Sequence, residues 1–215
     1  KPFFFFFADF FAELMSSSYS YGKHSVFFPG YPALVRVIFE TFEVLFGKVE
    51  QRFLGLVATG VMVNLLLQWL SYLLFSAFVS SAFGSSSLQK RSADLFLLIN
   101  PLSIYFTALY SESLFFFIQV AGLSVIYFSL RQGPLSLSAF ALSVAVLSTG
   151  GFVRSNGFLS IGYPIYFHLA KHSSSLLKLL KQTPLILFTI LFSVLPFVLV
   201  SIRAYRDLCP SFEFE

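Results

Sequence analysis

Between Phe53 and Gln89 the sequence contains no charged side chain. An α-helix needs about 20 mainly apolar residues to cross the hydrocarbon layer of a membrane, and this segment stays apolar as far as Phe83. Only 11% of all residues are charged, whereas soluble domains carry about a quarter. A chain with so few charges cannot cover its surface for water. The sequence therefore predicts an all-α, polytopic transmembrane helix bundle.

Six segments are apolar enough to be transmembrane helices, and we expect about six spans. Their approximate bounds are residues 53–83, 95–110, 114–130, 135–153, 158–170 and 184–202. We treat residues 1–215 as a single transmembrane domain, in which 1–52 form a loop and a surface helix, 53–202 form the spans and 203–215 form a tail.

Basic residues in the connections predict the orientation of the spans, because cytosolic loops carry an excess of Lys and Arg. Alternate connections hold six cations, so we place these connections in the cytosol: Lys90, Arg91, Arg131, Lys171, Lys178 and Lys181. The loop and surface helix, the turn at 110–113, the turn at 154–157 and the tail then lie on the non-cytosolic side. Four arginines do not follow the rule: Arg52, Arg154, Arg203 and Arg206.

Several classes of function are disfavoured by the same composition. The net charge is +4, but the cations are scattered rather than clustered as a phosphate-binding face requires, so we expect no nucleic-acid partner. The single cysteine, Cys209, and three dispersed histidines give no metal-ligand spacing. A glycine-rich phosphate loop is also missing from the sequence, which disfavours a nucleotide-driven enzyme.

The segment 31–46 differs from the spans because charges interrupt it. Arg36, Glu40 and Glu43 recur at spacings of four and three, which places them on one face of a helix. Four apolar residues lie elsewhere on that helix: Val35, Ile38, Phe39 and Phe42. We expect an interfacial amphipathic helix on the non-cytosolic membrane surface.

The clearest candidate for chemistry is the turn Arg-Ser-Asn-Gly at residues 154–157. The Arg154 guanidinium is a rigid fork of donors suited to phosphate, and Asn156 adds amide donors and an acceptor. Gly157 allows the backbone to turn and to approach a ligand. The alternative reading is an arginine that extends toward water from a helix end, and spacing alone leaves both open.

Acidic residues on the same predicted side form the second group of candidates. Glu112 follows Tyr110 and could accept sugar hydroxyls or pair with Arg154; the alternative is a solvated carboxylate in a turn. Asp9 and Glu13 lie in the N-terminal loop, and an acid beside the membrane could deprotonate an acceptor hydroxyl.

An ordered set of short motifs resembles the PIG-V family of GPI mannosyltransferases. The motifs span nearly the whole chain: Tyr19-x-Tyr21, Phe-Phe-Pro-Gly-Tyr-Pro at 27–32, Asn100-Pro101, Tyr-Ser-Glu at 110–112, Arg-Ser-Asn-Gly at 154–157, Leu-Pro-Phe at 195–197, Ala204-Tyr205 and Cys209. The resemblance implies a GT-C type fold in the endoplasmic-reticulum membrane, with the active site on the lumenal face. It also implies that the non-cytosolic loop, helix and tail are lumenal.

The resemblance further implies a reaction. The family transfers the second mannose, in α-1,6 linkage, from dolichyl-phosphate mannose to the GPI precursor, without another cofactor; the metal requirement stays open. An acid in the first lumenal loop is the expected general base. The family's Trp-Asp pair aligns with Phe6-Phe7, so we assign this role to Asp9, two residues later. Substrate binding is assigned to Tyr110, Glu112, Arg154 and Asn156.

Members of the family are considerably longer, so we expect this chain to be the N-terminal part of such an enzyme. We expect its partners to be the bilayer, both lipid-linked substrates and a small membrane-protein subunit. Two other classes compete. A transporter or channel would also use polar residues such as Asn64 and the Asn100-Pro101 break, although the notable polar groups gather at one membrane face. A non-catalytic subunit of a membrane assembly is the third possibility.

Overall fold

The computed structural model describes residues 29–83, 91–92, 95, 111–132, 136–172 and 176–208, and these residues form helices and no strand. The helices follow in the order α2 (Gly30–Phe46), α3 (Arg52–Phe83), α6 (Glu112–Gln132), α7 (Leu137–Ser148), α8 (Gly150–Val153), the 3-10 helix η2 (Gly157–Ile161), α9 (Gly162–His172) and α10 (Leu176–Leu208). The all-α prediction is confirmed for this part of the chain.

Three of the described helices are long and apolar enough to cross a membrane. They are Arg52–Ala82 of α3, Glu112–Gln132, which is α6, and Pro184–Arg203 of α10. Large apolar side chains remain exposed on them, for example Trp69 on α3 and Leu191 on α10, at 57% and 71%. Such surfaces suit lipid rather than water. At the predicted spans 53–83, 114–130 and 184–202 the structure therefore has helices of the required length and apolar character.

The other predicted spans differ from the structure or lie outside it. Residues 137–153 form a shorter apolar stretch that is divided at Thr149, whose N–H donates to the Val146 carbonyl and tightens the last turn of α7. The predicted span 158–170 is not one helix: η2 precedes α9, which has 11 residues and is about 16 Å long. The predicted span 95–110 falls almost entirely outside the described residues.

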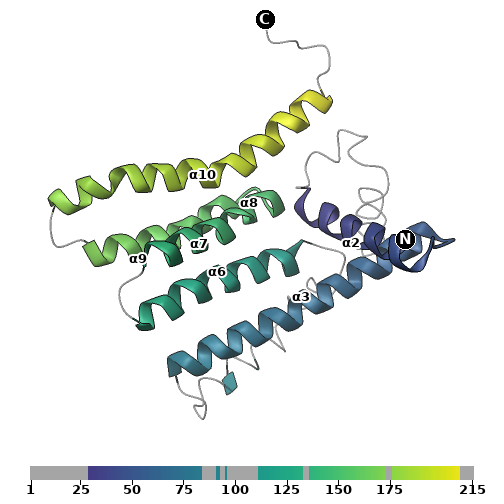
Figure 1. Cartoon of the computed structure of the whole chain (residues 1–215), viewed down its shortest axis with the longest axis horizontal. Helices are drawn as coiled ribbons and strands as arrows, with labels where there is room; N and C mark the ends of the chain where they lie inside the picture. The colour runs from purple at the N-terminus through teal and green to yellow at the C-terminus, as the bar shows by residue number, and fades with distance from the viewer. Residues whose placement is uncertain are drawn as a thin grey trace, which may run out of the picture.

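The helices lie side by side, with α6 between α3 and α7, and α10 packed along α7 and α8 (Figure 1). Leu114 near the start of α6 packs against the cluster that holds Val63 and Leu67 of α3. Arg131 near the end of α6 donates to the Ser81 hydroxyl near the end of α3. The two helices are therefore parallel, and the first turns of α3 extend about 15 Å beyond the start of α6.

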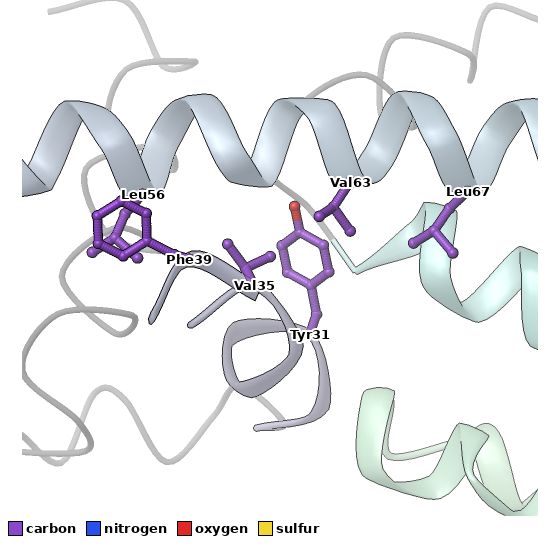
Figure 2. Close-up of a cluster of buried hydrophobic side chains, with 6 residues drawn as sticks. All are labelled: Tyr31, Val35, Phe39, Leu56, Val63 and Leu67. Atoms are coloured by element: carbon purple, nitrogen blue, oxygen red, sulfur yellow. The ribbon is translucent and has the colours of Figure 1, made fainter. Parts of the chain in front are cut away.

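Helix α2 packs on this extension of α3. Tyr31, Val35 and Phe39 form its buried face and meet three residues of α3 (Figure 2), namely Leu56, Val63 and Leu67. The Tyr31 hydroxyl donates to the Gly60 carbonyl at 3.1 Å, and burial raises the pKa of Tyr31, so the phenol stays neutral. This contact places the beginning of α2 beside the third turn of α3, close to the level where α6 starts.

The predicted amphipathic helix is present, but its apolar residues divide between two faces. Val35 and Phe39 are buried, whereas Ile38 and Phe42 are exposed. On the charged face, Arg36 Nε lies 2.8 Å from Glu40 Oε1, and the Arg36 guanidinium lowers the pKa of Glu40. The exposed apolar residues are available for a membrane surface, and that location remains a prediction.

Candidate active site

Glu112 is the first residue of α6. The helix begins there because the Phe115 N–H donates to the Ser111 carbonyl at 2.9 Å. A carboxylate in the first turn is favoured by the partial positive charge at a helix N-terminus. Its position at the start of a spanning helix places Glu112 at one end of the bundle.

Arg154 follows the single turn of α8, in a compact reversal of the chain. Its backbone is extended, with φ −147° and ψ 147°, and its N–H donates to the Gly150 carbonyl at 2.9 Å. Its carbonyl accepts from the Gly157 N–H at 2.9 Å. The Leu159 N–H then bonds to the Asn156 carbonyl at 3.1 Å. These bonds fix the direction in which the Arg154 side chain leaves the backbone.

Gly157 closes this reversal through a very short approach to α8. A Cβ atom at this position would lie 2.0 Å from the Gly150 carbonyl oxygen and 2.2 Å from its carbon. Real Cβ contacts do not reach such distances, so only glycine fits. The sequence predicts that Gly157 lets the backbone turn and approach a ligand. In the structure the backbone turns there and lies against Gly150 of the same chain, and the approach to a ligand stays a prediction.

The side chains of Arg154 and Glu112 meet in an ion pair. Arg154 Nη1 lies 3.0 Å from Glu112 Oε1, and the Arg154 guanidinium carbon lies 5.6 Å from the centroid of the Phe115 ring. The pairing that the sequence suggested is therefore present. The guanidinium does not simply extend from a helix end into water, because α6 supplies both its charge partner and its aromatic neighbour.

The ion pair leaves polar atoms free for a ligand. The Arg154 side chain is 39% exposed and makes one hydrogen bond to another described residue, so most of the five donors of a guanidinium are available. Glu112 Oε2 is buried and has no hydrogen-bond partner among the described residues. The exposed donors suit a ligand that carries a phosphate group, whereas Oε2 is enclosed by protein atoms.

A second polar contact joins the same two segments deeper in the bundle. Gln119 Nε2 donates to the Ser160 hydroxyl at 2.6 Å, linking α6 to η2. Neither residue is among the candidates predicted from the sequence. The available signal was an amide inside an otherwise apolar span, since polar groups at membrane depth are often functional or pair across helices.

The structure describes one of the three remaining predicted site residues. Asn156 lies exposed in the turn beside Arg154. Tyr110 and Asp9 lie outside the described residues. The first residue of α2 lies against α8: a Cβ on Gly30 would lie 2.7 Å from the Phe152 carbonyl oxygen. Within the described part of the chain no group of three His, Cys, Asp or Glu could hold a metal ion.

Comparisons with known proteins extend these findings. GPI mannosyltransferase 2 of Drosophila pseudoobscura pseudoobscura is 32% identical over 76% of this chain and 34% of its own length. GPI alpha-1,6-mannosyltransferase 2 of Mus musculus is 29% identical over 94% of this chain and 40% of its own length. The chain thus spans well under half of the curated relatives that it matches. No solved structure gives a significant match.

The family assignment covers nearly the whole chain. Residues 4–213 match the family described as Mannosyltransferase (PIG-V). The match includes the described ion pair between α6 and the turn after α8, as well as the N-terminal segment that leads into α2. The chain belongs to the PIG-V mannosyltransferase family.

Proposed function

We propose that this chain forms part of an endoplasmic-reticulum mannosyltransferase that transfers mannose from dolichyl-phosphate mannose to the GPI precursor in α-1,6 linkage. The observation that carries the proposal is the half-exposed Arg154 guanidinium, held by Glu112 at 3.0 Å at one end of the bundle. Family membership makes a transporter or a non-catalytic subunit the less favoured reading. A GT-C type architecture and a lumenal site are part of the proposal.

The proposed reaction is an inverting displacement at the anomeric carbon of mannose. The acceptor hydroxyl forms the new C–O bond and gives its proton to a carboxylate of the N-terminal loop, for which we propose Asp9. The bond between the anomeric carbon and the phosphate oxygen breaks, and dolichyl phosphate leaves with the electron pair. No metal or other cofactor enters this scheme.

The described residues support the charge-stabilising part of this reaction. Negative charge grows on the departing phosphate, and a fixed guanidinium aimed at that charge lowers the barrier because it does not need to reorganise. The contact with Phe115 and the ion pair with Glu112 fix the guanidinium in this way. Glu112 orients Arg154 through Oε1, whereas its Oε2 is buried and has no donor among the described residues. The exposed Asn156, together with Tyr110, would complete the binding of the head group.

The proposal is tested by expressing the protein from its complete coding sequence in cells that lack their own second GPI mannosyltransferase. Membranes from these cells should transfer radiolabelled mannose from dolichyl-phosphate mannose to the GPI precursor that carries one mannose. The product should lose its label to an α-1,6-specific mannosidase. Normal expression without any transfer would contradict the proposed function.

Glu112→Gln should lower the transfer rate roughly tenfold, because a charge-assisted hydrogen bond contributes about 1.5–3 kcal/mol and a tenfold rate change is about 1.4 kcal/mol. The glutamine keeps the shape of the side chain but removes the charge that holds Arg154. Glu40→Gln is the matched control, since Glu40 also pairs with an arginine, at 2.8 Å, but on an exposed face of α2. Equal rates for wild type and Glu112→Gln would remove Glu112 from the site.

The lumenal location of the site has its own test. In a Cys209→Ser background, Asn156→Cys should react with a membrane-impermeant maleimide only after the lumenal side of the microsomes is opened. Asn156 is exposed, so the reagent can reach it once it has access. Labelling of sealed microsomes, whose cytosolic face is outward, would place the turn on the wrong side for a lumenal enzyme.

A further inference from the structure

Among the described residues, two side-chain hydrogen bonds connect α6 to the segment between Arg154 and Ser160. One is the ion pair of Glu112 with Arg154, and the other is the hydrogen bond of Gln119 with Ser160. Glu112 and Gln119 are seven residues apart, which is about two helical turns, so they lie on the same face of α6. The segment is therefore attached to one face of α6 at both of its ends.

The deeper contact lies within the spanning part of α6. An amide in an apolar layer without a hydrogen-bond partner costs free energy. Gln119 avoids this cost because its Nε2 donates to the Ser160 hydroxyl at 2.6 Å. Ser160 is buried, with 7% of its surface exposed. Water therefore competes little for this bond.

The segment between the two contacts forms a compact unit with α8. It begins with the reversal at Arg154 and continues into η2. Its backbone hydrogen bonds, such as that from the Gly157 N–H to the Arg154 carbonyl, join residues of α8, the reversal and η2 to one another. Gly157 sits directly on Gly150, so α8, the reversal and η2 move as one unit. Packing against α7 and α10 also holds this unit, and the bond from Gln119 to Ser160 ties η2 directly to α6.

We propose that Gln119 and Ser160 are positioning residues, which act on the transferase reaction by holding Arg154 where it meets Glu112 and the leaving phosphate. This inference rests on the proposed function. Neither residue touches the reacting atoms. Their effect should therefore pass through Arg154, whereas a contact that merely helps helices to pack would lower the amount of folded protein without a specific dependence on Arg154.

The test is a set of variants in the transfer assay. Gln119→Met and Ser160→Ala each remove the bond with little change in volume, and each should lower kcat about tenfold, with a smaller effect on the KM for dolichyl-phosphate mannose. The variant that combines both should be no slower than either alone, since one bond is lost in each case. In an Arg154→Ala background, Gln119→Met should cause no further loss. Multiplicative effects in either combination would overturn the proposal.

Ser143→Ala is the matched control, because Ser143 is also a buried serine but, among the described residues, its hydroxyl bonds only to the Phe140 carbonyl of its own helix, at 2.8 Å. It should leave kcat unchanged. If it lowers kcat as much as Ser160→Ala does, the effect is one of general packing and the proposal is wrong.

A second measurement does not depend on activity. Hydrogen exchange of the chain in lipid nanodiscs, followed by mass spectrometry, reports on the backbone amides of Arg154, Gly157 and Leu159, which are all hydrogen-bonded. Gln119→Met and Ser160→Ala should raise their exchange rates at least fivefold, and Ser143→Ala should not. Unchanged exchange would overturn the positioning role even if the transferase is confirmed. Faster exchange in a protein without transferase activity would instead contradict the proposed function.

Discussion

Replacing Gly157 with alanine is expected to reduce mannose transfer at least a hundredfold and to lower the amount of folded protein. The added Cβ would lie 2.0 Å from the Gly150 carbonyl oxygen and 2.7 Å from the Gly151 nitrogen. Both are backbone atoms of α8 and cannot rotate away as a side chain can. Relief would require η2 and α8 to separate, and the reversal that orients Arg154 would open. Overpacking of this kind costs about 1–3 kcal/mol or more.

Gly162→Ala is the control for this substitution. Gly162 lies five residues later at the start of α9, and a Cβ there meets no atom within 4 Å. Alanine also favours a helix by about 1 kcal/mol relative to glycine, so expression and transfer should be at least normal. Thermal stability in detergent and the transfer rate would be measured for both variants. Full activity of Gly157→Ala would show that the close approach is not needed for the site.

Arg154→Ala should reduce transfer by about 100- to 1,000-fold, the usual loss when one fixed donor to a developing charge is removed. The guanidinium is the only described cation that is paired with Glu112, and it supplies both charge and several donors. Arg154→Lys should recover a part of the rate, because an ammonium keeps the charge but not the planar fork. The initial rate at saturating donor would be compared for the three proteins, together with their expression.

A loss of folding must be separated from a loss of chemistry. Arg154→Ala leaves the Glu112 carboxylate, whose side chain is 20% exposed, without its counter-ion, and an uncompensated charge of this kind is itself destabilising. The double variant Glu112→Gln/Arg154→Ala removes that charge. It should recover normal expression and still fail to transfer mannose. If the double variant regains activity, Arg154 serves only to neutralise Glu112 and does not act on the phosphate.

The sequence predicted those parts of the fold that depend on local composition. The uncharged run from Phe53 predicts α3 because apolar length alone decides whether a helix can span a membrane. The pairing of Glu112 with Arg154 was among the expected possibilities because the alternation of spans places both on one side. The resemblance to the PIG-V family is confirmed by the match over residues 4–213.

Other features depend on tertiary contacts that no local pattern encodes. The stretch 137–153 has the composition of a continuous span, yet it is divided at Thr149, where the chain turns into the glycine-rich contact of α8 with η2. The partnership of Gln119 with Ser160 joins residues 41 positions apart, and neither residue belongs to a motif. The sequence shows the amide of Gln119 within an apolar span, but it does not show which residue this amide bonds to. Asp9 and Tyr110 remain predictions from the resemblance.

The length of α6 has a consequence for how a lipid-linked donor could be handled. Its 21 residues correspond to about 31 Å, close to the thickness of the hydrocarbon layer. A bilayer that fits α6 from end to end therefore brings the Glu112–Arg154 pair to the depth at which the phosphates of the surrounding lipids lie. If the proposed function holds, a polyprenyl phosphate would reach the guanidinium by diffusing within its own leaflet, with its tail in the acyl chains throughout.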